Sequence, residues 1–299
     1  MSDYVELHTH SAFSFLDGAS APEELAEAAA AQGHTALALT DHDGLCGSLA
    51  FAHAARAAGV RPLTGAELTL DDGSHLTLLA RDATGYASLC RLITRAHRDT
   101  RPPPDRRAVP PSLPIDELER RHDGLVILSG CAQHGLVPRH LAGGDRAGAE
   151  RALRRLVTIA GRRDVYVEIQ RPRTRGDRRL ARELVALAEE VGVKPVATGN
   201  VHAHDNRRAF LQDAFAALQH NASLDASEAV RRGNRAAVLR PTEEMAAMFR
   251  DHPEAVAETK RLAERIEFDL TRDLGYRFPD FSDSDPRRTA QQALGDLCV

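Results

Sequence analysis

Short apolar runs alternate with stretches of helical periodicity between residues 4 and 200, and this alternation constrains the fold more than any other feature of the sequence. Strands are predicted at 4–7, 36–39, 61–68, 75–80, 125–128, 165–169 and 193–197. Helices are predicted between most of them, at 22–31, 45–58, 86–97, 146–160 and 178–190. Strands that alternate with helices imply βαβ units around a parallel sheet. Seven such units favour an α/β fold, a seven-stranded (β/α) barrel, over two small domains.

The pattern changes after residue 206, where helices are predicted at 208–218, 242–249 and 253–264 without strands between them. Residues 1–205 are therefore assigned to the barrel and residues 206–275 to a helical extension that packs on it or completes it. Residues 276–299 are assigned to a linker and the start of a further region, because the helix predicted at 289–297 simply stops. The chain is thus expected to be truncated. Six prolines between residues 100 and 114 predict an exposed loop.

Charge and composition limit the partners and the location of the chain. The 299 residues carry a formal net charge of −4, which is not the polycation expected of an autonomous nucleic-acid binder. Arginines cluster at 98–107 and 171–182, and runs of this kind usually lie on solvated surface. No window is apolar enough for a membrane span and the N-terminus lacks an export signal, so a cytoplasmic location is expected. The four cysteines lie far apart, which argues against a disulfide framework or a zinc finger.

Metal-binding side chains recur where the predicted strands end, which is the position of the active site in barrel enzymes. His8 and His10 close the first strand, and two residues apart on an extended chain they point to the same face. Glu67 ends the third strand. Further candidates follow the second, fifth and seventh strands: His42, Cys131, Asn200 and His202.

Imidazole, carboxylate and thiolate ligands together suit zinc, and they suit manganese if oxygens dominate. These candidates are too many for one tetrahedral ion. The residues therefore predict a multinuclear site in which Glu67 is able to bridge two ions. Closely spaced metals of this kind hydrolyse phosphoesters, and that is the predicted reaction class.

Four segments resemble the motifs of the polymerase and histidinol phosphatase (PHP) superfamily: 7–11 (LHTHS), 40–44 (TDHDG), 65–68 (GAEL) and 199–202 (GNVH). Four others resemble the N-terminal domain of bacterial C-family polymerases: 14–20 (SFLDGAS), 75–80 (HLTLLA), 92–96 (LITRA) and 128–131 (LSGC). Within that family the chain is most similar to the error-prone alpha-subunit type used in damage-induced mutagenesis. The resemblance extends over essentially the whole chain.

The resemblance implies a distorted seven-stranded (β/α) barrel of PHP type that holds up to three ions of Zn²⁺ or Mn²⁺. Carried over by position, the first ion would be held by His8, His10, Glu67 and Asn200, the second by Glu67, His75 and Cys131, and the third by Asp17, His42 and His202. Asn200 departs from the pattern, because the superfamily often has aspartate there. Its amide oxygen is able to coordinate but adds no negative charge, which affects the first metal's affinity and hence hydrolysis.

Three of these residues also have alternative, purely structural readings. His75 could be a satisfied core histidine, Cys131 an inert buried thiol, and Asp17 a turn former beside a glycine. Glu168, on the sixth strand, is expected to face the site without binding metal. Arg171 is the basic residue expected nearest a phosphate.

The function implied is that of the PHP domain of an error-prone DNA polymerase, without polymerase activity in this chain. Its chemistry would be removal of a 3′ nucleotide from DNA by ions on His8, His10, Glu67 and His202. The partners implied are DNA, the remaining polymerase domains and other replication or mutagenesis proteins, but no membrane. Two alternatives remain: a metal-stabilised structural module without turnover, and a free-standing phosphatase acting on a small phosphomonoester. An amidohydrolase is disfavoured, because neither lysine ends a strand.

Overall fold

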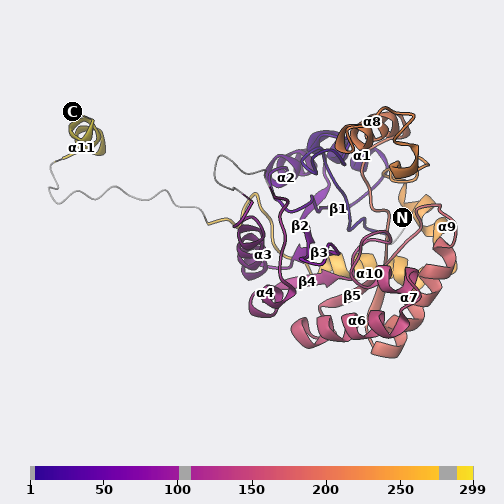
Figure 1. Ribbon diagram of the computed structural model, residues 1–299. Coiled ribbons are helices and arrows are strands. Elements are labelled where there is room, and N and C mark those ends of the chain that lie inside the picture. The colour runs from indigo at the N-terminus through magenta and orange to yellow at the C-terminus, as the bar shows by residue number, and fades with distance from the viewer. Residues whose placement is uncertain (1–3, 101–108, 276–287, 299) are drawn as a thin grey trace.

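The structure is a computed structural model that describes residues 4–100, 109–275 and 288–298. At the centre of these described residues lies one curled sheet of six strands in the order β1-β2-β3-β4-β5-β6 (Figure 1). The strands are β1 (Ala36–Leu39), β2 (Arg61–Thr69), β3 (His75–Ala80), β4 (Leu125–Leu128), β5 (Val165–Gln170) and β6 (Lys194–Thr198). The predicted α/β class is confirmed, and these six strands match six of the predicted runs within a residue.

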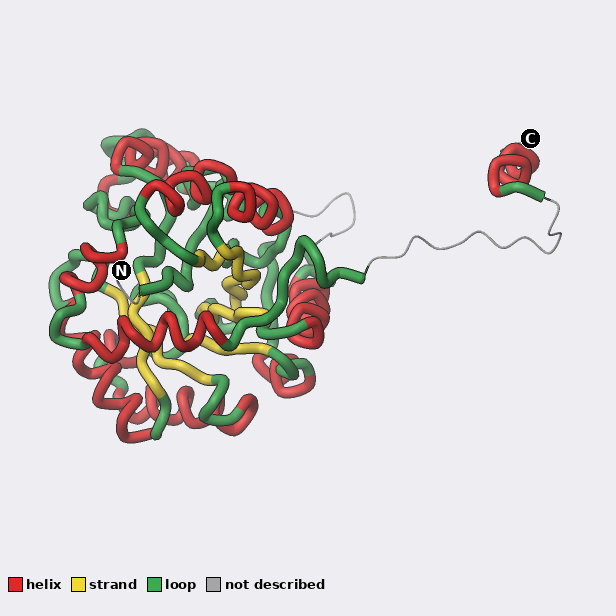
Figure 2. Tube along the Cα trace, turned by 180° about the vertical axis from the view of Figure 1, so that it is seen from behind, coloured by secondary structure: helices red, strands yellow, loops and turns green. Residues whose placement is uncertain are grey.

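Helices surround the sheet, as Figure 2 shows from behind. They are α1 (Pro22–Ala31), α2 (Ser48–Ala57), α3 (Ala83–Ala96), α4 (Ile115–Arg120), α5 (Pro138–Ala142), α6 (Arg146–Ala160), α7 (Asp177–Val191), α8 (Ala209–Gln219), α9 (Thr242–Met248) and α10 (Pro253–Glu264). A further helix, α11 (Ala290–Leu297), does not belong to this layer. Local sequence explains several boundaries. Asp82 and Asp145 cap α3 and α6 by accepting a hydrogen bond from a backbone N–H of the first turn. Gly192 ends α7 in the left-handed conformation that glycine adopts without strain.

The strand β3 runs antiparallel to both of its neighbours, which corrects the prediction of a parallel sheet. The connection 70–74 between β2 and β3 is a tight turn that contains Gly73 at φ +77°. A parallel partner would need a crossover of a dozen residues or more, so a connection this short permits only a hairpin. The other pairs, β1 with β2, β4 with β5 and β5 with β6, are parallel as predicted.

Residues 4–10 lie between β1 and the chain that follows β6, but they form no regular strand. Single parallel pairs join Glu6 to Leu37 and Thr9 to Val201. The buried Glu6 carboxylate accepts the backbone N–H groups of the next two residues, so those donors are lost to a strand ladder. The predicted seventh strand at 4–7 is therefore not confirmed, although this segment occupies the gap between the two ends of the sheet.

Apolar side chains pack on both faces of the curled sheet. The inner face carries a cluster that includes Leu7, Leu63 and Val126, and it is closed by Leu262 of α10 and by Ile266, just after that helix. The guanidinium of Arg61, the first residue of β2, donates hydrogen bonds to two carbonyls near the end of α10 at 2.8 and 2.9 Å. The helix α10 therefore covers the edge at which the parallel strands begin, and it leaves their carboxyl ends open.

Two predicted loops lie largely outside the described residues: the basic part of the proline-rich segment at 101–108, and the linker at 276–287. Among the helices that the structure describes, none combines the length and apolarity that crossing a bilayer requires.

Candidate metal centre

The ends of β1 and β2 and the start of β3 bring three of the candidate side chains to one edge of the sheet. His75 is the first residue of β3 and pairs with Thr69 near the end of β2. Because β3 is antiparallel, its beginning lies where β2 ends, which explains how a residue at a strand start joins residues at strand ends. His42, just after β1, forms a parallel pair with Glu67.

The N-terminal segment and the chain after β6 add the remaining imidazoles. The backbone N–H of His10 donates to the carbonyl of Val201 at 2.7 Å, and the N–H of Val201 donates to the carbonyl of His8 at 2.9 Å. This parallel pairing places His10 beside His202. Sequence positions almost two hundred residues apart thus share one site.

His8, His10 and Glu67 form the most buried group of potential ligand atoms. The Nε2 atoms of His8 and His10 lie 2.9 Å apart, and each lies within 3.1 Å of the same Glu67 oxygen, Oε2. All three residues are buried, with at most 1% of their surface exposed. Imidazole nitrogens and a carboxylate oxygen that converge away from solvent form a donor set typical of a transition-metal site.

The protonation of Glu67 and His10 suits a cation. Burial opposes ionisation of Glu67, but the His8 charge and hydrogen bonds from the surrounding imidazoles lower the pKa of Glu67 well below its usual value. Burial, together with the charges of His202 and His42, lowers the pKa of His10 well below its usual value. An ionised carboxylate beside a neutral imidazole is the state that metal ligands adopt.

Glu168 on β5 orients His8. Its Oε1 lies 2.6 Å from Nδ1 of His8, opposite the ring nitrogen that faces Glu67. Burial disfavours the charged ring, but the carboxylates of Glu168 and Glu67 outweigh it and raise the pKa of His8 well above its usual value. A carboxylate that holds one ring nitrogen leaves the other directed at the metal position, an arrangement common behind metal-bound histidines.

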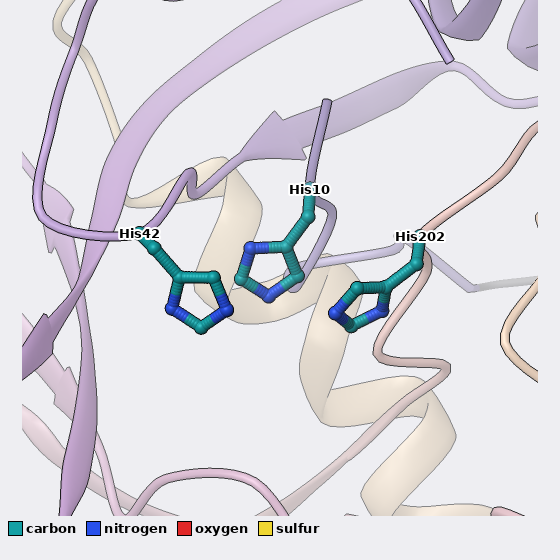
Figure 3. Close-up of side chains that lie close together, drawn as sticks. All are labelled: His10, His42 and His202. Carbon is teal, nitrogen blue, oxygen red and sulfur yellow. The ribbon is translucent and has the colours of Figure 1, made fainter. Parts of the chain in front are cut away.

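Two further groups of potential ligands overlap the first. One consists of His42, Glu67 and His75, and the other of His10, His42 and His202. The rings of the latter three lie near one another, with centroids 4.4 Å apart for His10 and His42 and 4.3 Å for His10 and His202 (Figure 3). Glu67 Oε1 lies 2.7 Å from Nδ1 of His75, so the two Glu67 oxygens serve different groups.

Asp17 extends the third group toward solvent. Its Oδ2 lies 3.1 Å from Nε2 of His42 and 3.0 Å from Nε2 of His202. Nδ1 of His202 donates to the backbone carbonyl of Asn200 at 2.8 Å, so the lone pair of the neutral ring lies on Nε2, the nitrogen that faces Asp17. Burial opposes ionisation of Asp17, but His202, His42 and Arg232 lower its pKa well below the usual value.

Asn200 supplies a test of whether the site fits a cation. Its side-chain Oδ1 is buried and makes no hydrogen bond within the described part of the chain. A buried carbonyl oxygen without a donor is costly, and a metal ion is one group that would satisfy it. The backbone of Asn200 has φ +48°, a left-handed conformation that asparagine tolerates better than most residues. The side-chain oxygen of Asn200 therefore fits the role of a metal ligand.

Cys131 lines one cavity together with His42 and Glu67, but its sulfur is not among the ligand atoms of the three close groups. The Sγ atom accepts a hydrogen bond from the N–H of His134 at 3.4 Å. Burial and the nearby Glu67 charge raise the pKa of the Cys131 thiol well above its usual value. Binding a cation through this sulfur would require loss of that proton.

A cavity of about 710 Å³ opens over these groups and gives them access to a ligand. Its size lies within the range of about 300–1,000 Å³ that is usual for small-molecule sites. Its lining contains all but two of the nine predicted ligand residues: Asp17, His42, Glu67, His75, Cys131, Asn200 and His202. His8 and His10 lie beneath it, fully buried.

Arg171 lies elsewhere. Its guanidinium donates to the carbonyl of Met248 at 2.7 Å and pairs with Asp251, and it lies 5.2 Å from the centre of the Phe249 ring. These contacts attach the end of β5 to the segment between α9 and α10. The Arg171 side chain lines a different cavity from the predicted metal ligands, and its phosphate contact stays a prediction.

Arg232 and His134 line the metal-centre cavity although the sequence did not indicate either one. Arg232 donates to Oδ1 of Asp17 at 3.0 Å. It follows a short 3-10 turn, Glu228–Val230, in a segment without strands. No strand end marks its place, so a prediction from strand ends could not find it.

Comparisons with known proteins identify the family of the chain. A family model described as PHP domain matches residues 6–172. An error-prone DNA polymerase of Symbiobacterium thermophilum is 40% identical over 273 residues, which cover 88% of this chain and 25% of that protein. An error-prone DNA polymerase of Mycobacterium bovis is 41% identical over 278 residues, which cover 89% of this chain and 25% of that protein.

The chain therefore spans about a quarter of the length of these curated relatives. A solved amidohydrolase structure from Chromobacterium violaceum aligns with 67% of this chain and 87% of its own at 18% identity and a TM-score of 0.47, which is too distant to assign a reaction. The family match covers more than half of the chain and includes the strand-end motifs at residues 7–11, 40–44 and 65–68. The chain belongs to the PHP domain family.

Proposed function

We propose that this chain acts as the PHP domain of an error-prone DNA polymerase and that it hydrolyses phosphoesters with metal ions bound at its strand-end cavity. The observation that carries the proposal is the convergence of three overlapping ligand groups, which share Glu67, His10 and His42, beneath one open cavity. Shared ligands favour ions only a few ångströms apart, the arrangement that phosphoesterases use. The substrate we propose is the 3′ end of single-stranded DNA.

Up to three ions, Zn²⁺ or Mn²⁺, would occupy the centre. The residues proposed to hold them are His8, His10, Asp17, His42, Glu67, His75, Cys131, Asn200 and His202, of which His8, His10, Glu67 and His202 would have the largest effect on catalysis. When bound, the ions would polarise the phosphate and activate water for attack on phosphorus.

The chain's own residues have separate tasks in this proposal. Glu168 holds the His8 ring in one orientation, and the carbonyl of Asn200 does the same for His202. Arg232 lies at the cavity and forms an ion pair with Asp17. Its guanidinium is suited to hold a phosphate oxygen, the role that the sequence predicted for Arg171.

We also propose how the chain is divided. Residues 1–205 would form the metal-binding barrel, with residues 4–10 in the place of its seventh strand, and residues 206–275 a helical extension that completes it. Residues 276–299 would lead toward the remaining polymerase domains, where nucleotidyl transfer would take place. DNA and other replication or mutagenesis proteins would be its partners, in the cytoplasm.

The test is hydrolysis of a 3′-labelled single-stranded oligonucleotide by the purified chain with Mn²⁺ or Zn²⁺. We expect release of mononucleotides by the native chain and loss of at least about a hundredfold in rate for His10→Ala. His53→Ala is the matched control, because His53 is exposed on α2 and outside the cavity. Absence of release by a chain with measured metal content would contradict the proposal.

A structural module without turnover is the second candidate, and Asn200 favours it. An amide at this position supplies an oxygen ligand but no negative charge, so it would hold an ion without contributing the charge of a carboxylate. In this case removal of the metal would lower the stability of the fold. His10→Ala would cause no loss of hydrolysis, because the native chain would hydrolyse nothing.

A further inference from the structure

One aromatic side chain stands exposed at the mouth of the metal-centre cavity. Phe15 is 84% exposed and lines the cavity with its neighbours Leu16 and Asp17. Phenylalanine is usually buried among other apolar side chains, and packing of that kind does not explain a phenylalanine this exposed. Its position two residues from Asp17, which touches His42 and His202, ties it to the metal centre.

The turn that presents Phe15 is strained. Leu16 has φ +62°, a left-handed conformation that a bulky side chain rarely adopts. The turn is held by hydrogen bonds from the N–H groups of Asp17 and Gly18 to the carbonyl of Ser14, at 3.0 and 2.9 Å. Gly18 has no space for a side chain, because a Cβ there would lie 1.8 Å from the carbonyl oxygen of Ser11. Strain of this kind concentrates at functional sites.

Two arginines lie on the same cavity. Arg232 donates to Oδ1 of Asp17 at 3.0 Å. Arg231 lies 3.5 Å from Asp213 by its Nη1, and its buried Nε makes no hydrogen bond within the described residues. An exposed aromatic ring beside guanidinium groups is the combination with which proteins hold single-stranded nucleic acid, by stacking on bases and pairing with phosphates.

We propose that Phe15 is a positioning residue that stacks on the unpaired terminal base of a nucleic-acid strand whose phosphate reaches the metal centre. This inference rests on the proposed function and narrows its substrate class, because a ring at the cavity mouth selects a strand end whose base is free. A terminal base inside a duplex is already stacked and paired, so its release would cost free energy and weaken binding.

An exposed phenylalanine on α8 does not share this arrangement. Phe210 is 63% exposed, but it lies outside the cavity lining and its ring is covered by Arg235, whose guanidinium carbon is 4.3 Å from the ring centre. Phe210 is therefore a matched control for the loss of an exposed phenylalanine.

The test uses the full chain and a single-stranded oligonucleotide with 2-aminopurine as its last base and a phosphorothioate at its last linkage, which slows hydrolysis. Stacking on an aromatic ring quenches 2-aminopurine fluorescence, so binding and stacking are read together. We expect quenching by the native chain, retention of affinity by Phe15→Trp and Phe210→Ala, and weakening by Phe15→Ala of roughly five- to 150-fold, the range of base–aromatic stacking. A blunt duplex with the same base should bind more weakly.

Phe15→Ala that binds and quenches as well as the native chain would overturn the proposal, as would a native chain that does not quench or that prefers the blunt duplex. Hydrolysis of a small phosphodiester without a base by the native chain reports on the proposed function separately. Hydrolysis without quenching would reject the stacking role alone. Quenching lost in Phe15→Ala would support that role even if a metal-loaded chain hydrolyses nothing, a result that would reject the proposed function.

Discussion

At the scale of single residues, the metal centre depends on how each ring is held. Glu168 and the Asn200 carbonyl each occupy one nitrogen of a histidine and leave the other free. Asn200 contributes in a second way, since its own side-chain oxygen is buried without a donor. A neutral ligand in this place weakens the attraction for a cation relative to a carboxylate.

Asn200→Asp is therefore expected to raise metal affinity by on the order of tenfold, because aspartate adds a negative charge at nearly the same oxygen position and also tolerates φ +48°. Titration with Mn²⁺ and elemental analysis of the purified chain would measure this. Asn200→Ala, which removes the oxygen, should bind less metal than the native chain. Unchanged or lower affinity in the aspartate variant would show that this oxygen faces no ion.

The sequence predicted most of the site at this scale because metal ligands of one family recur in short motifs at strand ends. His8, His10, His42, Glu67 and His202 all follow that pattern, and the structure brings them together. Arg171 also follows a strand, but its guanidinium turns to Asp251 and the Met248 carbonyl. The position of a residue in the sequence predicts that it lies at a strand end, but it does not predict the direction of the side chain. An arginine that points into the cavity therefore could not be distinguished from one that anchors a neighbouring helix.

At the scale of elements, the segment 4–10 shows how a buried carboxylate takes the place of strand pairing. Glu6 accepts hydrogen bonds from the Tyr4 hydroxyl and from the N–H groups of Leu7, His8 and Gly199. Despite those bonds, burial raises the pKa of Glu6 to about 7. The side chain thus joins the N-terminal segment to the end of β6 directly beneath the histidines.

Glu6→Ala should lower the free energy of unfolding by about 3–5 kcal/mol, because it leaves several buried donors without an acceptor. Chemical denaturation monitored by circular dichroism would measure the change. Glu6→Gln keeps one oxygen acceptor and should cost less than the alanine variant. A loss below about 1 kcal/mol for Glu6→Ala would mean that the segment is held by its apolar contacts instead.

The sequence predicted the strands and long helices well because their periodicity extends over whole elements. It did not give the antiparallel direction of β3, which follows from the length of the 70–74 connection. It also missed α4 and α5, each of six residues or fewer, because one or two turns are too short to establish a period. The strand predicted at 4–7 failed for a different reason: its donors pair with Glu6, and periodicity does not reveal that competition.

At the scale of the whole molecule, the two edges of the sheet have different tasks. The helix α10 covers the edge where the parallel strands begin, and its Leu262, with Ile266 just after the helix, fills the inner core. The opposite edge carries the ligand groups and the cavity. The potential ligands at that edge come from the N-terminal segment, from β2 and β3, and from the segments after β1 and β6. An ion there would therefore join the N-terminal segment to both ends of the sheet.

Chelation is therefore expected to lower the melting temperature by roughly 5–10 °C relative to the chain in a metal concentration about a hundred times the dissociation constant. Differential scanning calorimetry with and without a chelator would measure this, and restoring Mn²⁺ should reverse it. His10→Ala should show a smaller difference between the two conditions, because His10 belongs to two of the three ligand groups. An identical melting temperature of the native chain with and without metal would contradict metal bracing.

We propose that histidines and a glutamate from distant parts of the chain jointly bind metal ions. The most direct measurement is an anomalous-scattering map of crystals grown with Mn²⁺, collected at the manganese edge. We expect peaks about 2 Å from the free ring nitrogens of His8 and His10 and from Glu67, with further peaks near His42, His75 and His202. A map without a peak among these residues, from crystals in which manganese is shown to be present, would contradict the claim.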